Sequence, residues 1–522
     1  MTQRAPPVLP QGASPPATET GLLERLHAYP ADVVARMRLG NMYFRQARHE
    51  EAAAQFRKAL QHAPDLAQAR WMLAGSYAYR GDWKMALAEV QTLLRGEPER
   101  AQYLDIEAYA LLQLGECDRA IAGYEALLAK YPTAENWKSY GRALKTVGRT
   151  AGAIDAYRRA LALKPDYGMV WWSLAELKSV RFEPADIGAM QTALHGESRS
   201  PQNQALLHFA LGRAYEDGRQ YENAFGHYSR ANAAVRSYVR HDPEQHASFV
   251  RRNECVFTPE YFQARAGWGS SRPDPIFIVG LPRSGSTLLE QILASHSWIE
   301  ATAELQALES VVRELSRRAT GQKYPEAMQE ISAEQARQAG EDYLARAAAY
   351  RKLNRPFFID KMPNNFSYVG AIRTFLPNAK IIDARRHPLG SGFAIFRHYF
   401  VEAYSFAFDL ADIGRYYRDY VELMAHFDAV QRGRVHRVVY EDLIAAPEHE
   451  IRRLLEYCGL PFEGQCLRFY ENPRAVLTPS SEQVRQPISA EASRLWRHYE
   501  PWLEPLKSAL GDVLDRHPNA SE

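Results

Sequence analysis

The stretch PIFIVGLPRSGSTLLEQIL, residues 275–293, decides how the second half of the chain folds. Its apolar start, residues 276–279, predicts a buried strand, and a turn bounded by Gly280 and Gly285 follows it. We expect a helix to begin at Ser286. Backbone N–H groups at such a helix start point outward, and the helix dipole favours an anion there. The segment therefore predicts a site that cradles a phosphate group.

The glycine spacing also limits which phosphate compound fits the loop. Two glycines five positions apart are typical of nucleoside-triphosphate loops, but Ser286 stands where those loops carry a lysine. That lysine reaches the outer phosphates of ATP or GTP, so its absence, with Arg283 inside the loop, argues against a kinase or GTPase. Because an ordinary strand-to-helix turn has the same spacing, it is the complete strand–PRSGST–helix string that favours a phosphate ester.

Length and charge narrow the class of protein. A chain of 522 residues exceeds what one core usually organises, which predicts two or more domains. With 64 Lys and Arg against 62 Asp and Glu, no charge excess favours nucleic acid or an anionic membrane as partner. Histidine and cysteine show no metal-ligand spacing, so no metal is expected. The four cysteines are expected to be buried free thiols in a reducing compartment: Cys117, Cys255, Cys458 and Cys466.

No targeting segment is apparent in the sequence. Residues 1–20 lack the apolar core of a signal peptide and predict a disordered tail rich in proline and alanine. No later apolar run approaches the roughly 20 residues that span a bilayer. The expectation is a soluble, cytoplasmic protein.

The first half of the chain is a repeat array. Pro64, Pro98, Pro132 and Pro165 recur at intervals of 34, 34 and 33 residues. Each closes a unit in which small residues alternate with tyrosine or phenylalanine, as in Leu39, Gly40, Tyr43, Ala52, Phe56 and Ala59 of the first unit. This period resembles the tetratricopeptide repeat (TPR) and predicts an α-helical solenoid over residues 21–236, with four regular and two degenerate units. A generic helical bundle would not keep this register.

A second domain is expected after a helical connection and linker at residues 237–272. Its apolar runs at 276–279, 357–360 and 380–384 alternate with helical segments such as 367–375, which predicts an α/β domain with a central parallel sheet over residues 273–510. Residues 511–522 are expected to form a C-terminal tail.

Basic residues follow each of these strands directly. Arg283 with Ser284, Lys361, and Arg385 with Arg386 stand at the three strand ends. Because ligands bind at the carboxyl ends of parallel strands, these side chains are expected to converge on an anionic nucleotide.

PRSGST is similar to the 5′-phosphosulfate loop of sulfotransferases, which use 3′-phosphoadenosine 5′-phosphosulfate (PAPS). Residues 275–500 resemble the protein-tyrosine sulfotransferase type, and with its repeats the chain resembles bacterial TPR–sulfotransferase proteins. The resemblance implies a general base at Glu304, twenty-one residues after Arg283. It also implies that Lys361 and Ser480 stabilise the bridging oxygen. The residues implied for PAPS binding are Arg283, Ser284, Gly285, Ser286, Thr287, Arg386, Ser391, Tyr440, Ser480 and Arg485.

The sequence departs from the family pattern near the 3′-phosphate site. Ala394 replaces the usual serine eight residues after Arg386, so either Ser391 substitutes for it or one hydrogen bond is missing. Leu495 replaces a late lysine, which leaves Arg485 or Arg494 to supply that charge.

Several of these residues also have ordinary structural explanations. Glu304 could open a helix, Lys361 could be a solvated loop residue, and Tyr440 could belong to the core. Arg385 is expected to pair with a surface carboxylate, and Asp442 to cap a helix from Leu443 onward.

The function expected from the sequence is transfer of the PAPS sulfonate to an acceptor hydroxyl. The acceptor could be a tyrosine of a protein or peptide that the TPR groove presents, or a small hydroxylated molecule. Two alternatives stay open: a TPR adaptor with a degenerate nucleotide domain, for which Ala394 is the best support, and a P-loop nucleotide kinase.

Overall fold

The computed structural model describes residues 18–196, 200–319, 321–400, 404–474, 476, 482–488 and 491–519. The chain divides into two compact units, Met1–Ala160 and Leu161–Glu522. The division falls inside the predicted solenoid, so the last repeat-like helices share a unit with the sheet. The predicted domain limits at residues 236 and 273 therefore remain predictions from sequence pattern.

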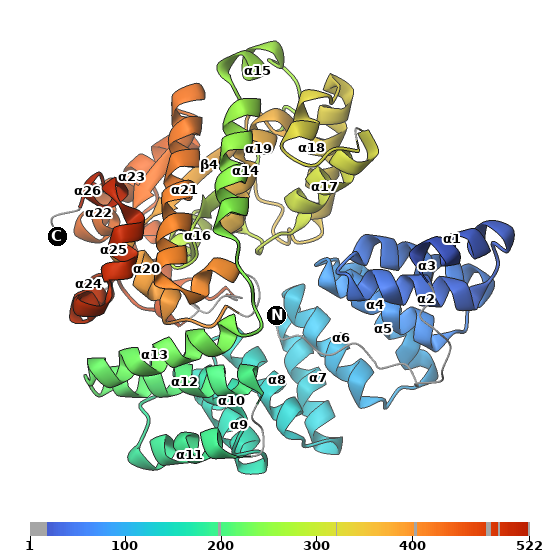
Figure 1. Ribbon diagram of the computed structural model, residues 1–522, viewed down its shortest axis with the longest axis horizontal. Helices are drawn as coiled ribbons and strands as arrows, with labels where there is room; N and C mark the ends of the chain where they lie inside the picture. Colours follow the sequence, from blue (N-terminus) through green and yellow to red (C-terminus); the bar gives the residue numbers. More distant parts are fainter. Residues whose placement is uncertain are drawn as a thin grey trace. The chain divides into compact units, whose positions relative to one another are not determined.

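The first unit is an array of paired helices, coloured blue to cyan in Figure 1. Gly40 packs against Phe56 so closely that a Cβ on the glycine would lie 2.6 Å from the ring, and Gly141 meets Tyr157 at the same distance. This contact between small and large residues explains why the repeat keeps its register. The helices are α1 (Glu19–Ala28), α2 (Val33–Arg45), α3 (His49–His62), α4 (Ala67–Tyr79), α5 (Trp83–Gly96), α6 (Ala101–Gln113), α7 (Cys117–Lys130), α8 (Ala134–Thr146) and α9 (Thr150–Leu163).

The second unit opens with helices of the degenerate repeats and the connection. A Cβ on Gly212 would lie 2.5 Å from the Tyr228 ring, so the same packing persists here. Asn232 donates a hydrogen bond of 2.8 Å to the Phe396 carbonyl, which joins these helices to the sheet domain. The helices are α10 (Gly168–Ala175), α11 (Pro184–His195), α12 (Pro201–Asp217), α13 (Tyr221–Arg236), α14 (Pro243–Val256) and α15 (Pro259–Ala264).

A five-stranded sheet forms the centre of the second unit. Its strands are β1 (Pro275–Gly280), β2 (Ile299–Ala301), β3 (Phe357–Asp360), β4 (Lys380–Arg385) and β5 (Val435–Val439). They lie in the order β2-β3-β1-β4-β5, and every neighbouring pair is parallel. The predicted parallel sheet is confirmed. Because the chain places β3 and β4 on opposite sides of β1, their carboxyl ends flank the phosphate loop.

Helices cover both faces of this sheet. On one face Ile276 and Ile278 join a core cluster with residues of α16 (Ser286–Ala294) and α23 (Pro447–Cys458). On the other face Phe277 packs against Tyr343 of α18 (Ala333–Ala348), and Asp383 accepts a hydrogen bond from Tyr420 of α21 (Leu410–Val430). Every residue of β1 is buried, which explains its uninterrupted apolar run.

The remaining short elements connect this framework. They are α17 (Ala307–Ala319), α19 (Val369–Phe375), α20 (Pro388–Phe396), α22 (Tyr440–Ala445), α24 (Glu491–Arg494), α25 (Glu504–Leu510) and α26 (Asp512–Asp515). The 3₁₀ segments are η1 (Glu326–Gln329), η2 (Pro363–Tyr368), η3 (Ser405–Phe408), η4 (Gly464–Cys466), η5 (Phe469–Glu471), η6 (Gln483–Arg485) and η7 (Leu495–Trp502).

Some local expectations were wrong. Residues 363–368 form a 3₁₀ segment, so the helix expected over 367–375 begins at Val369. Asp442 lies inside α22 rather than at its cap, and it accepts a hydrogen bond of 3.1 Å from Asn519. Cys458 and Cys466 are buried, but Cys255 is exposed. The predicted C-terminal tail includes helix α26.

Across the described ranges, no helix combines the length and the apolar character that crossing a bilayer requires.

Candidate active site

Close packing fixes the turn between β1 and α16. Gly280 and Gly285 have φ angles of +142° and +95°. A Cβ on Gly280 would lie 2.5 Å from the Ala384 carbonyl oxygen, and one on Gly285 would lie 2.7 Å from the Tyr440 ring. Arg283 also has a positive φ, +67°, which is uncommon for a residue with a side chain. The ends of β4 and β5 thus shape the loop, and only glycine fits at its two boundary positions.

A pocket lies over this loop, at the carboxyl ends of β1, β4 and β5. Arg283, Gly285, Ser286 and Thr287 line it from the loop and the start of α16. The strand ends and more distant segments supply its other lining residues: Lys178, Leu288, Arg386, Tyr440, Phe469, Gln483, Val484, Gln486, Pro487 and Ile488. The predicted donor-site residues Arg283, Gly285, Ser286, Thr287, Arg386 and Tyr440 therefore meet in one pocket.

Two guanidinium groups lie close together in this pocket. Arg386 donates a 3.3 Å hydrogen bond to the Arg283 carbonyl and lies 5.0 Å from the centroid of the Tyr440 ring. Burial lowers the pKa of Arg386. Burial, with the nearby Arg397 and Arg386, lowers the pKa of Arg283 to about 10. Both guanidinium groups still carry charge at neutral pH, and a bound anion would offset their repulsion.

Two buried hydroxyl groups of predicted donor residues lie outside the pocket lining and lack hydrogen-bond partners among the described residues: Ser284 Oγ in the loop and Ser391 Oγ on α20. Leaving such a group unsatisfied costs about 1–3 kcal/mol. Ser391 lies on α20, three positions before the buried Ala394, so both residues share one helix face. A phosphate oxygen could accept from either hydroxyl.

The predicted catalytic pair forms a direct contact. The ammonium group of Lys361 donates to Oε1 of Glu304. Lys361 directly follows β3, the neighbour of β1, and its side chain is 1% exposed, whereas that of Glu304 is 46% exposed. The alternative of a solvated loop residue at Lys361 is wrong, because the side chain is buried.

Glu304 is held in a loop and not at a helix start, which corrects the alternative of an N-terminal-turn carboxylate. The loop joins β2 to α17, which begins three residues later at Ala307. Thr302 donates to the Ile359 carbonyl through its hydroxyl at 2.7 Å and its N–H at 3.2 Å. The Leu305 N–H donates to Asp360 at 3.4 Å. These contacts on both sides fix the backbone of Glu304.

Asp360 is a buried acid that sequence reasoning missed. It accepts a 3.0 Å hydrogen bond from the Tyr343 hydroxyl and directly precedes Lys361. Burial raises the pKa of Asp360 to about 7, and the charge of Glu304 raises it as well, although Tyr343, Leu305 and Lys361 act in the opposite direction. The available signal was an aspartate at the end of the apolar run FFID.

Arg385 pairs with a carboxylate of its own strand and is not among the residues that line the pocket. It forms an ion pair of 2.7 Å with Asp383, and its guanidinium lies 5.1 Å from the Tyr420 ring. The predicted carboxylate partner exists, but it is buried and not on the surface.

The last predicted donor residues lie in the C-terminal segment. Ser480 falls outside the described residues. Arg485 donates a 3.1 Å hydrogen bond to the Arg474 carbonyl, while its neighbours Val484 and Gln486 line the pocket. Arg494, the other candidate for the missing lysine charge, lies at the end of α24. The donor roles of Arg485 and Ser480 remain predictions.

Lys178 is a charged lining residue that sequence reasoning missed. It lies between α10 and α11, in the region interpreted as degenerate repeats, about a hundred residues before the phosphate loop. Nothing in the repeat pattern distinguishes it from a solvated lysine.

Residues 275–464 match the sulfotransferase family, and residues 34–66, 71–135 and 107–168 match tetratricopeptide repeats. The matched ranges agree with the parallel sheet and the helical array described above. The chain therefore contains a region similar to the sulfotransferase family, preceded by repeats similar to tetratricopeptide repeats.

Among relatives, a protein of Aquifex aeolicus (strain VF5) bearing the name "Uncharacterized protein" is 32% identical over 375 residues, 70% of this chain and 49% of that protein. The protein-tyrosine sulfotransferase of Drosophila melanogaster is 25% identical over 261 residues, 45% of this chain and 51% of that protein. The chain thus spans about half the length of these relatives. The solved sulfotransferase domain of the Synechococcus PCC 7002 olefin synthase is 20% identical, with a TM-score of 0.29 over 44% of this chain and 96% of that domain.

Proposed function

We propose that this protein transfers the sulfonate group of PAPS to an acceptor hydroxyl group. The observation that carries the proposal is the Lys361–Glu304 ion pair, which stands at the end of the strand next to a phosphate loop lacking the lysine of nucleotide kinases. A cation and a carboxylate in this place supply the two functions that sulfonate transfer to a hydroxyl needs.

The residues of the pocket fit a nucleotide with phosphate groups at both ends. The loop amides and the start of α16 would hold the 5′-phosphosulfate, with Ser284 as a further donor. Arg386 and Ser391 would hold the 3′-phosphate, and Tyr440 would contact the adenosine side. The orphaned hydroxyls of Ser284 and Ser391 support this fit, because phosphate oxygens would satisfy both.

PAPS supplies an activated sulfonate: the bond from sulfur to the bridging oxygen breaks, and a bond to the acceptor oxygen forms. Lys361 would stabilise the negative charge that develops on the departing bridging oxygen. Glu304 would take the proton of the acceptor hydroxyl, and its exposed carboxylate is accessible to an incoming acceptor. Arg283 would hold the sulfonate oxygens, and Ser480 stays a predicted donor to the bridging oxygen.

Tyrosine in a protein or peptide is the acceptor that we propose, presented by the TPR array. The similarity to protein-tyrosine sulfotransferases supports this acceptor. A phenol, with a pKa of about 10, gives up its proton to a carboxylate base more readily than an alkyl hydroxyl does. A small hydroxylated molecule is the competing acceptor.

The two other functions have weaker support. A nucleotide kinase would need the loop lysine that Ser286 replaces. A pure adaptor would have no use for a buried lysine paired with an accessible carboxylate.

Binding and turnover together test the proposal. Calorimetry should show that the product nucleotide 3′-phosphoadenosine 5′-phosphate (PAP) binds. PAP should also raise Tm, because a hundredfold excess over Kd adds about 2.7 kcal/mol to the free energy of unfolding. ATP or GTP with Mg²⁺ should stabilise far less. Radiolabelled sulfonate from PAPS should appear on a phenolic acceptor. Equal stabilisation by Mg-ATP and PAP, or PAP binding without any transfer, would contradict it.

A further inference from the structure

We propose that Lys178, from the repeat-like helices, is a donor-binding residue whose ammonium group contacts an anionic group of the bis-phosphorylated adenosine nucleotide. This inference rests on the proposed function, because it extends the same pocket. It assigns part of the donor site to residues far outside the range that matches the sulfotransferase family.

The position of Lys178 is the first support. Lys178 lines the pocket together with Arg283, Ser286, Thr287 and Arg386. Three cations from three separate segments therefore surround one cavity. The carboxylate of Glu441 lies 4.0 Å from Arg386 and offsets part of this charge. A compact polyanion would offset the repulsion among the three cations in this partly buried site.

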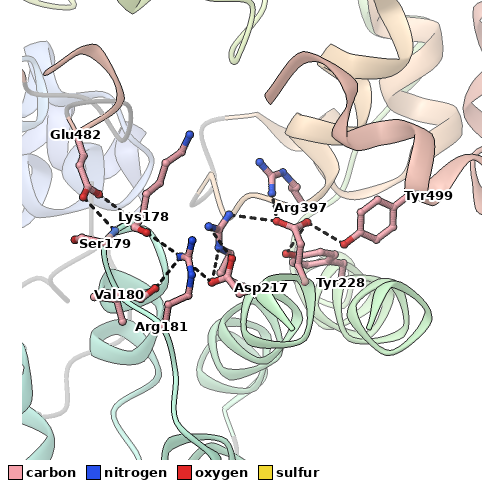
Figure 2. Close-up of polar contacts among 11 residues, drawn as sticks. Lys178, Ser179, Val180, Arg181, Asp217, Tyr228, Arg397, Glu482 and Tyr499 are labelled. Atoms are coloured by element: carbon pink, nitrogen blue, oxygen red, sulfur yellow. Dashed lines mark hydrogen bonds and ion pairs between the residues drawn. The ribbon is translucent and has the colours of Figure 1, made fainter. Parts of the chain in front are cut away.

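The ammonium group of Lys178 is available for a ligand. No hydrogen bond or ion pair from it to another described residue exists in the structure, and in Figure 2 the side chain extends away from its own backbone contacts. Burial is the main cause that lowers the pKa of Lys178 to about 8, and three nearby arginines lower it further: Arg397, Arg213 and Arg283. The charge of Glu482 acts in the opposite direction.

The backbone of Lys178 is held firmly, unlike that of an ordinary surface loop. The carboxylate of Glu482 accepts the N–H of Lys178 at 2.5 Å and that of Ser179 at 3.1 Å. Leu177 and Val180, on either side, are buried. Glu482 belongs to the segment whose residues Gln483 and Val484 also line the pocket, so one carboxylate fixes two walls of the donor site together.

A chain of polar contacts continues from this loop to the sheet domain (Figure 2). Arg181 donates to the Lys178 carbonyl at 2.8 Å and pairs with Asp217 at 3.5 Å. On the same helix, Glu216 accepts from Tyr499 at 2.9 Å and pairs with Arg397, which follows α20. The repeat-like helices are thereby held in register with the pocket, as a binding role for Lys178 requires.

The test is PAP binding by calorimetry to the full chain carrying Lys178→Met. We expect Kd to increase about ten- to a hundredfold, which is the worth of a hydrogen bond to a charged group. Lys178→Arg should retain most of the affinity. Lys323→Met, a matched change at an exposed lysine outside the pocket lining, should leave Kd unchanged.

A pH series separates binding from a merely structural role. Wild-type affinity for PAP should fall as pH rises from 7 to 9, because the lysine loses its proton near pH 8. Lys178→Arg should show a flatter profile, since arginine keeps its charge. This comparison decides the matter even if Lys178→Met folds poorly.

The outcomes distinguish the two proposals. Wild-type protein that does not bind PAP would contradict the proposed function, and with it the role of Lys178. Wild-type protein that binds PAP, with Lys178→Met binding equally well or the arginine variant sharing the same pH profile, would contradict the role of Lys178 alone.

Discussion

The side chain of Lys361 is only 1% exposed, yet its ammonium group forms an ion pair with the carboxylate of Glu304, whose side chain is 46% exposed. The pair joins the end of β3 in the sheet interior to a surface that an acceptor can approach. A buried charge of this kind persists only with a partner. The two members of the pair have different roles in the proposed transfer.

Loss of the carboxylate should affect turnover and not donor binding. We expect Glu304→Gln to retain the wild-type Kd for PAP and to lower kcat about 10²–10⁴-fold, as for a lost general base. Glu309→Gln, an exposed glutamate in the helix that follows, is the matched control. A rate near that of the wild type would remove Glu304 from the mechanism.

Loss of the lysine should slow the same step for a different reason. Lys361→Met keeps the side-chain length but removes the charge that would stabilise the departing oxygen, so kcat should fall about 10²–10³-fold. Single-turnover transfer from PAPS measures this directly. An unchanged rate would mean that the ion pair is only structural.

Burial of Asp360 should make stability pH-dependent. Its pKa in the folded state, about 7, lies above the ordinary aspartate value of 3.8, so between these pH values the folded state holds a proton that the unfolded state has lost. This contribution to stability is complete at low pH and is lost as pH rises towards 7.

Asp360→Asn should remove this loss of stability at rising pH, because asparagine does not ionise. Relative to wild type, the variant should therefore gain free energy of unfolding between pH 4 and pH 8, on the order of 1–4 kcal/mol. Urea unfolding at both pH values gives the difference, with the exposed Asp515→Asn as control. A constant difference between wild type and Asp360→Asn would contradict the shifted pKa.

Ala394 offers a change that should improve binding. Ala394→Ser should restore a donor towards the 3′-phosphate and lower the Kd for PAP at least a few-fold, within the 1.5–3 kcal/mol of a charged hydrogen bond. Ser391→Ala should weaken PAP binding by a similar factor. If Ala394→Ser changes nothing while Ser391→Ala does, Ser391 already fills the role.

Removal of the first compact unit should separate acceptor presentation from chemistry. A chain beginning at Leu161 should sulfate a small phenol at the full-length rate but lose kcat/KM on a protein acceptor, because remote binding energy is gone. Loss on both acceptors would make the repeats a brace, and loss on neither would assign them to an unrelated partner. Retained PAP binding is the control for folding.

Sequence reasoning reached furthest where local pattern and burial agree. The apolar runs of β1, β3 and β4 and the glycine-bounded turn before α16 were located within a residue or two, because strands buried on both faces leave uninterrupted apolar stretches. Strand β2, with three residues, is too short to leave such a pattern. Its missing signal explains why Glu304 was considered as a helix start.

Long-range contacts were beyond the sequence. The roles of Glu304 and Lys361 came from family resemblance, since no periodicity relates residues 57 positions apart. Glu482 and Lys178 are 304 positions apart, so in the sequence they look like unrelated surface charges. Tertiary packing, which propensity does not encode, creates both.

The carboxylate of Glu216, shared by Arg397 and Tyr499 across the junction of helix and sheet domain, bears on how such proteins can be recombined. Exchanging repeat arrays between relatives at the linker before Pro273 would separate Glu216 from Arg397 and Tyr499. A chimaera joined near Leu161 keeps Glu216, Arg397 and Tyr499 in one segment from the same parent protein. Gene fusions that diversify the repeats should accordingly preserve α10–α13 with their own catalytic partner, and vary only the units before them.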